Sequence, residues 1–217
     1  MNPQLKNLLN QSVGHSFAKQ LAFGDLLGDG SWRIDLTEGR VFFGDDLSFR
    51  IQLLGTESEG NATWLWAWAN EASNLPAELL ELCTLLKTTG EQGSIPELSE
   101  RSFPLEQANG HTLAMIAAGL FNCCYYRAPY PGGALFFLVQ NPPAQVAEPV
   151  GITRAATVIT EVISEFDVDH LAMSEAFLTS QGFTVSRGEQ SLIGEREQRT
   201  MTLTFDTGER ITRIQVD

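Results

Sequence analysis

The sequence predicts an α+β fold, in which an antiparallel meander sheet packed with helices is followed by a smaller part of two helices and three strands. Two observations carry this prediction. Apolar and polar residues alternate in four stretches of residues 31–70, which is the period of half-buried strands. Elsewhere apolar residues recur every three or four positions, as in helices, and these stretches form blocks without a regular alternation with strands.

The chain begins with a predicted helix over residues 3–22. Its apolar residues recur four positions apart and form one stripe: Leu5, Leu9, Val13, Phe17 and Leu21. His15 falls off this stripe, so we expect its side chain to be solvated. Three glycines between positions 24 and 30 then end the helix.

Four strands are predicted next. SWRIDL and RVFFG flank the turn TEG and form a hairpin, and LSFRIQLLG is the third strand. The fourth, TWLWAWAN at residues 63–70, is so apolar that we expect it at the centre of the sheet, because an apolar edge strand invites pairing with other chains. The protein itself should bury the tryptophan face of this strand. A helix can approach the opposite face, which carries Leu65, Ala67 and Ala69.

Helices and strands continue to residue 140. A helix is predicted over residues 74–90, with Pro76 near its first turn and Gly90 at its end. Residues 111–123 are apolar nearly all round, which indicates a buried helix. Residues 124–140 indicate two strands around a turn of proline and glycine.

Three prolines in NPPAQVAEPVG, residues 141–151, mark the best boundary candidate, and we expect this segment to be extended and mostly exposed. The prediction is a main domain over 1–143, a Pro-rich joint over 144–151 and a C-terminal subdomain over 152–217; the two parts can pack as one unit. The subdomain should contain helices over residues 152–166 and 169–181 and strands near 183–192, 195–205 and 210–216.

The charge of the chain excludes several classes of partner. The formal net charge is −13, and lysine occurs only at Lys6, Lys19 and Lys87. Nucleic acids and anionic membrane surfaces both require clustered cations, so we expect binding to neither. A basic protein is the partner that fits this charge. The chain has no apolar run long enough for a membrane-spanning helix, and its first twenty residues do not have the pattern of a signal peptide.

The cysteines and histidines suggest no catalytic or metal centre. Cys83, Cys123 and Cys124 are odd in number, and neighbouring cysteines rarely bridge each other, so we expect reduced thiols in a cytoplasmic protein. Cys123 or Cys124 could act as a nucleophile with His111 as base, but their apolar surroundings favour buried, unreactive thiols. The three histidines stand in no metal-binding spacing, and we predict no metal and no cofactor.

The stretches SWRIDLTEGRVFF, FRIQLLGTES and TWLWAWAN resemble an uncharacterised bacterial family, a domain of unknown function with this tryptophan-rich strand. The resemblance extends over residues 31 to 125 and is specific at the tryptophan strand. It implies one coherent domain in this region. It implies no activity and no catalytic residue.

Two groups of residues are candidate binding sites. In a strand, Trp64, Trp66 and Trp68 share one face, which either packs in a core or walls an aromatic pocket with Asn70 and Glu71 at its mouth. The second group lies between residues 155 and 186, where no lysine or arginine occurs. A basic protein could dock on its acidic residues, which are Glu161, Glu165, Asp167, Asp169 and Glu175.

The sequence therefore favours a soluble bacterial protein that acts as a non-catalytic binding or interaction module with an acidic surface. The alternative is a small-molecule-binding protein or a minor enzyme with an aromatic pocket walled by Trp64, Trp66 and Trp68. Salt-sensitive association with a basic protein, together with the absence of a deep pocket, would support the first function. A concave cavity lined by the tryptophans would support the second.

Overall fold

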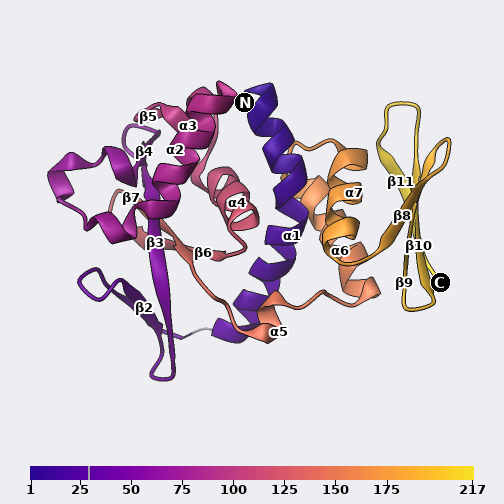
Figure 1. Ribbon diagram of the computed structural model, residues 1–217, viewed down its shortest axis with the longest axis horizontal. Coiled ribbons are helices and arrows are strands. Elements are labelled where there is room, and N and C mark those ends of the chain that lie inside the picture. Colours follow the sequence, from indigo (N-terminus) through magenta and orange to yellow (C-terminus); the bar gives the residue numbers. More distant parts are fainter. Residues whose placement is uncertain (29) are drawn as a thin grey trace.

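Helix α1 (Pro3–Leu27) runs through the middle of the molecule in the computed structural model, which describes residues 1–28 and 30–217 (Figure 1). A sheet with its own helices lies on one side of α1, and the C-terminal helices and a second sheet lie on the other. Helices and antiparallel strands thus form separate blocks, and the predicted α+β class is confirmed.

The larger sheet is antiparallel at every pairing in the described part of the chain. Strands β1 to β5 follow one another across the sheet, and β7 pairs with both β3 and β6. The predicted four-strand meander is confirmed, because β1, β2, β3 and β4 are neighbours in this order. The strands are β1 (Trp32–Asp35), β2 (Arg40–Phe43), β3 (Leu47–Ser58), β4 (Thr63–Trp66), β5 (Ser102–Pro104), β6 (Cys124–Tyr130) and β7 (Gly133–Val139).

The tryptophan strand is shorter than predicted. β4 ends at Trp66, and residues Ala67–Ala69 form the 3-10 turn η1, so Trp68 leaves the strand face that Trp64 and Trp66 share. The prediction of a strand over 63–70 is therefore wrong beyond Trp66. The central position is confirmed, because β4 pairs with β3 and with β5. Burial is confirmed as well, since Trp64 and Trp66 are both 0% exposed.

A helix covers the tryptophan side of β4, and the prediction that a helix covers the opposite side is wrong. The Trp66 indole N–H donates to the carbonyl oxygen of Glu97 in α3 over 2.9 Å, and Trp64 packs edge-on against Phe136, with 5.6 Å between ring centroids. Indoles are the largest apolar bodies of this strand, so covering them removes more apolar surface from water than covering Leu65 does. Leu65 instead lines a hollow at the protein surface.

The helices between β4 and β6 differ from the prediction mainly where they begin. Asn74 has a left-handed φ of 43°, and Pro76 precedes a 3-10 turn, so the helix predicted from residue 74 begins only at Glu81. The buried helix predicted over 111–123 is confirmed as α4. These elements are η2 (Glu71–Ser73), η3 (Ala77–Leu79), α2 (Glu81–Gly93), α3 (Pro96–Ser99) and α4 (Gly110–Leu120).

Two predictions for the C-terminal part need correction. The strand predicted over 183–192 is divided by a turn in which Gly188 N–H donates to the carbonyl oxygen of Ser191, so the sheet has four strands, in the order β11-β10-β9-β8. The Pro-rich segment contains a short helix with Val146 buried against the core, so it is not extended throughout. The elements are α5 (Ala144–Ala147), α6 (Ile152–Glu165), α7 (His170–Ser180), β8 (Thr184–Arg187), β9 (Ser191–Arg196), β10 (Arg199–Phe205) and β11 (Ile211–Val216).

Small residues allow α1 to approach its neighbours on both sides. Figure 1 shows α4 on one side of α1 and α7 on the other. A Cβ atom added to Gly14 of α1 would lie 2.7 Å from Cβ of Phe177 in α7, which is closer than two carbon atoms can approach. A Cβ atom added to Gly119 of α4 would lie 2.6 Å from Cβ of Ser12 in α1. Both helix contacts therefore depend on the absence of a side chain.

Hydrogen bonds reinforce the same two contacts. Ser16 Oγ of α1 donates to the carbonyl oxygen of Met115 in α4 over 2.7 Å. Asn10 Oδ1 of α1 accepts from the backbone N–H of Asp169 at the start of α7 over 3.0 Å. Apolar residues from both parts of the chain join in one core cluster around this helix. The division into domains stays a prediction.

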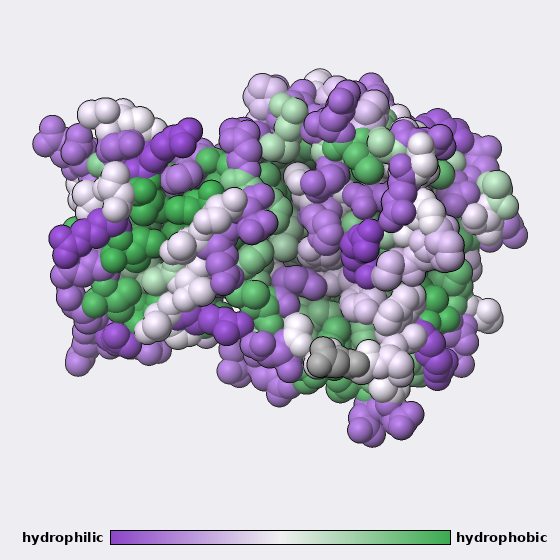
Figure 2. Space-filling model, turned by 180° about the vertical axis from the view of Figure 1, so that it is seen from behind, coloured by the Kyte–Doolittle hydropathy of each residue, from purple (hydrophilic) through white to green (hydrophobic). Residues whose placement is uncertain are grey.

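The second sheet is covered unevenly. Leu192, Met201 and Leu203 of β9 and β10 are fully buried, but the apolar residues of the edge strand β11 are only half-buried. Figure 2, which shows the molecule from behind, has apolar side chains gathered over the C-terminal part, on the left of the view, with a band of polar residues across them. Half-buried apolar residues on α6 and β11 are Ala156, Ile163, Ile211, Ile214 and Val216.

We predict that Gly14→Ala destabilises the protein, although alanine is the better helix former. The added methyl group meets Phe177 at 2.7 Å, and overpacking of this kind costs roughly 1–3 kcal/mol. Gly24→Ala in the same helix is the matched control, because its added methyl group meets no atom within 4 Å. The control should gain up to about 1 kcal/mol from helix propensity. Urea denaturation measures both changes, and equal effects at the two positions would contradict the close contact.

Replacing Trp66 by alanine should lower the free energy of unfolding by roughly 3–5 kcal/mol, the range for emptying a buried aromatic site. The side chain is 0% exposed, and its N–H bond to Glu97 is also lost. Trp68→Ala, at a half-buried position, should cost less. A loss below about 1 kcal/mol for Trp66→Ala, typical of exposed positions, would contradict its role in the core.

Candidate binding groove

An open groove of about 840 Å³ lies beside α1. Its walls come from α1, from the segment that leads into α4, from α4 itself, from β6 and from the end of α6. Residues far apart in the sequence therefore meet there. The groove is lined by Met1, Leu9, Phe17, Leu105, Glu106, Gln107, Ala108, Asn109, His111, Thr112, Met115, Tyr125, Glu161, Glu165, Phe166 and Asp167.

Negative charge dominates the lining of the groove. Four carboxylates line it, and no lysine or arginine does so among the described residues. Asp167 forms an exposed ion pair, because Lys6 Nζ donates to its Oδ1 over 2.8 Å, and this bond lowers the pKa of Asp167. Glu161 and Glu165 lie one turn apart on α6, and within the described part of the chain neither of them forms an ion pair. The groove therefore favours a cationic group.

Apolar side chains also line the groove. Phe17 of α1 and Phe166, just after α6, meet edge to face with 6.3 Å between ring centroids. Leu105 and Met115 contribute aliphatic surface. A site with both carboxylates and aromatic rings suits a ligand with a cationic head and an apolar stem, as in lysine and arginine side chains.

His111 and Tyr125 form the polar pair of the groove. His111 Nδ1 lies 2.9 Å from the Tyr125 hydroxyl oxygen. Burial raises the pKa of Tyr125 to about 12. Partial burial lowers the pKa of His111, and the Glu57 carboxylate partly opposes this effect. Both groups are therefore uncharged at neutral pH, and the imidazole can exchange hydrogen bonds with a ligand without adding charge to the groove.

The start of helix α4 fixes the position of His111. Asn109 caps α4, since its Oδ1 accepts from Thr112 N–H over 2.9 Å. Gly110 N–H donates to Glu57 Oε1 of β3 over 2.6 Å, which ties the first turn of α4 to the sheet. This bond joins residues far apart in the chain, so neighbouring residues alone give no sign that His111 and Tyr125 meet.

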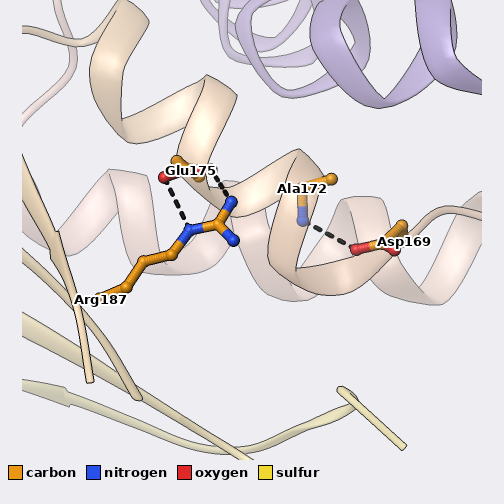
Figure 3. Close-up of polar contacts among 4 residues, drawn as sticks. All are labelled: Asp169, Ala172, Glu175 and Arg187. Atoms are coloured by element: carbon orange, nitrogen blue, oxygen red, sulfur yellow. Dashed lines mark hydrogen bonds and ion pairs between the residues drawn. The ribbon is translucent and has the colours of Figure 1, made fainter. Parts of the chain in front are cut away.

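The structure brings three of the five predicted acidic residues into the groove and separates the other two. Glu161, Glu165 and Asp167 line it. Asp169 caps α7 by accepting from Ala172 N–H over 2.8 Å. Glu175 holds Arg187 of β8, whose Nε donates to Glu175 Oε1 over 2.9 Å, and this bonding lowers the pKa of Glu175 (Figure 3). Internal contacts therefore occupy these last two carboxylates.

The predicted tryptophan site is divided as well. Trp64 and Trp66 are fully buried, so neither can wall a surface pocket. Trp68 is half-buried in η1, with Lys87 Nζ 4.8 Å from the centre of its ring. Glu71 bonds to Arg101 over 2.8 Å, and Asn70 lines the hollow on the other side of β4. A ligand-binding role for this group stays a prediction.

The three cysteines are free thiols and buried. Burial raises the pKa of Cys83 and of Cys123 to about 11 and that of Cys124 to about 12. His111 bonds to Tyr125, and no hydrogen bond joins it to a cysteine among the residues described. These thiols have the character of small apolar residues and not of nucleophiles.

A buried lysine forms a polar contact that the sequence does not suggest. Lys19 is only 3% exposed, and its ammonium group bonds to Asn122 Oδ1 without a carboxylate ion pair in the described part of the chain. His15, expected to be solvated, instead lies between Asn122 and Gln181, at 3.3 and 3.4 Å. Burial lowers the pKa of both Lys19 and His15. This contact joins α1 to the start of β6 and to the end of α7.

The fold and the cavity together define the class of this protein as an α+β protein with an open acidic groove. Residues 6–142 match the family of unknown function DUF6882, and the chain belongs to this family. The match is wider than the resemblance at residues 31–125, and residues 143–217 lie outside it. No curated protein and no solved structure matches the chain.

Two observations bear on metals and membranes. Among the described residues, no three histidine, cysteine or acidic side chains lie close enough together to hold a metal ion. No helix in residues 1–28 and 30–217 combines the length and the apolar character that crossing a membrane requires.

The three cysteines should react slowly with iodoacetamide at pH 8. With pKa values of about 11 to 12, less than about one thiol in a thousand is ionised at that pH, against a few in ten for an ordinary cysteine. Alkylation followed by mass spectrometry should be at least about a hundredfold slower in the native protein than in denaturant, and its rate should rise with pH. A thiol that reacts equally fast in both states would contradict this assignment.

Proposed function

We propose that the protein is a non-catalytic binding module whose acidic groove receives a cationic segment of a partner protein. The lining of the groove carries this proposal, because it combines four carboxylates with aromatic and aliphatic side chains and contains neither lysine nor arginine among the described residues. A lysine or arginine side chain fits this composition. Its stem packs on Phe17 and Phe166, and its charged head faces Glu161 and Glu165.

The charge of the whole chain supports the same partner. A net charge of −13 attracts a basic protein from a distance and raises its association rate. Such attraction weakens as salt screens the charges, so binding by this groove is salt-dependent. The same field repels nucleic acids and anionic membranes, which we exclude as partners.

A binding role has more support than a catalytic one. The Tyr125 hydroxyl is hard to ionise at neutral pH, since burial raises its pKa to about 12. The thiols of Cys123 and Cys124 are buried with raised pKa values. An aromatic pocket walled by tryptophans has less support, because Trp64 and Trp66 are fully buried. Free thiols also support a reducing compartment, which is the cytoplasm in our proposal.

Charge removal in the groove tests the proposal. A fluorescently labelled peptide of nine arginines serves as probe, and anisotropy measures its affinity at low salt. Glu161→Gln with Glu165→Gln should weaken binding about fivefold, since two exposed ion pairs contribute roughly 1 kcal/mol together. Glu148→Gln with Glu195→Gln is the matched control, because it removes the same charge from two exposed carboxylates outside the groove.

The control separates the groove from the overall charge of the protein. We expect the control pair to bind the peptide within twofold of the unchanged protein, and we expect raised salt to weaken binding in all three proteins. Equal losses for the two pairs of substitutions would mean that only net charge attracts the peptide. That result would overturn the groove as the binding site.

A further inference from the structure

A second cavity, the sheet hollow, lies on the face of β4 that does not carry the buried tryptophans. Its volume is about 350 Å³. Leu65 of β4, Thr56 of β3 and Leu135 of β7 are register partners and form one row across its floor. The helix that the sequence predicts over this face is absent from the described structure, so the hollow remains open to solvent.

Apolar side chains remain exposed around the sheet hollow. Leu36 is 37% exposed and Tyr130 is 46% exposed, and both line it. Leu75 adds a half-buried side chain from the segment between η2 and η3. A concave site with mostly apolar walls and a volume of a few hundred Å³ has the form of a small-molecule pocket.

A few polar groups accompany these walls. Thr56, Asn70 and Ser73 line the sheet hollow and supply two hydroxyls and one amide. The rim that carries Asn70 is held in place, because Asn70 N–H donates to the carbonyl oxygen of Ala67 and Arg101 donates to that of Ala69, both over 3.1 Å. Such groups can orient one polar end of a ligand.

The residues that line the sheet hollow indicate which charge a ligand should have. No charged residue lines it among the described residues, although the chain carries a net charge of −13. A charged ligand would lose hydration there without gaining a counterion, and an anion would also be repelled by the protein. The nearby Glu71 is already bonded to Arg101. Complementarity of charge therefore favours an uncharged ligand.

We infer that the sheet hollow binds an uncharged small molecule with an apolar body and one hydrogen-bonding end. The hollow has room for about a dozen waters, at about 30 Å³ each, and so for a ligand of about that many heavy atoms. This inference is independent of the acidic groove, because the two cavities share no lining residue. The groove favours a cationic group, whereas the sheet hollow favours an uncharged ligand.

The test compares three probes of one shape and different charge. These are 1-octanol, octanoate and octylammonium, titrated into the full chain at pH 7 and followed by ¹H–¹⁵N NMR. We expect saturable binding of one octanol per chain, with shifts at Leu65, Thr56 and Leu135, and at least tenfold weaker binding of both ions. No saturable octanol binding, or binding of the ions with equal affinity, would overturn the inference.

Two variants locate the octanol. Ser73→Trp, at an exposed rim position, should fill the sheet hollow and weaken octanol binding at least tenfold, whereas Ser164→Trp on the exposed surface of α6 should leave it unchanged. Asn70→Leu keeps the shape of the side chain and should weaken binding about fivefold, the size of one neutral hydrogen bond. Circular dichroism verifies that each variant is folded. Octanol binding that neither Ser73→Trp nor Asn70→Leu weakens would overturn the inference.

Two further outcomes are decisive. Glu161→Gln with Glu165→Gln should leave octanol binding unchanged, so failure of the groove and failure of the sheet hollow can be told apart. The shifts of Leu65 and Leu135 should not depend on protein concentration in the absence of octanol. Concentration-dependent shifts there would mean that a second copy of the chain covers the hollow, which would overturn the small-molecule site.

Discussion

The close contact of α1 with α4 and α7 is the constraint on which the rest of the structure depends. Gly14 and Gly119 leave no room for a methyl group between these helices. Because α1 lies at this short distance from both neighbours, the apolar residues of both parts of the chain form one core cluster around it. Leu9 and Phe17 of the same helix also line the acidic groove, so the helix that contacts both parts of the chain forms one wall of the groove.

The acidity of the groove follows from where the few lysines lie. Lys6 bonds to Asp167, Lys19 is buried beside Asn122, and Lys87 lies between Glu91 and the ring of Trp68. Each lysine thus has a structural contact. Glu161 and Glu165 form no ion pair in the described part of the chain. Their uncompensated charges make the groove negative.

Local patterns predicted most of the elements. The hairpins, the apolar helix α4 and the long helix α1 follow from periodicity and turn residues, which depend only on neighbours in the chain. The end of β4 was missed because TWLWAWAN alternates as a strand does, although the chain turns into a 3-10 helix after Trp66. The turn at Gly188 was missed for a similar reason, since the residues on both sides of it have strand character.

The candidate sites were less predictable. Glu161 and Glu165 could be proposed from a stretch without lysine or arginine, but tertiary packing brings them into one groove with His111 and Tyr125. The ion pair of Glu175 likewise depends on β8 folding back onto α7. The residue type of Trp64 and Trp66 fits both a core position and the wall of a pocket. Only the structure distinguishes the two, because it shows that both side chains are fully buried.

The position of α1 also constrains how the chain folds during synthesis. This helix precedes its partners in the chain, and its hydrogen bonds to Met115 and Asp169 join residues 99 and 159 positions apart. The apolar stripe of α1 can therefore be covered only after most of the chain has been synthesised. Contacts of such long range slow folding and prolong the time in which apolar surface can aggregate.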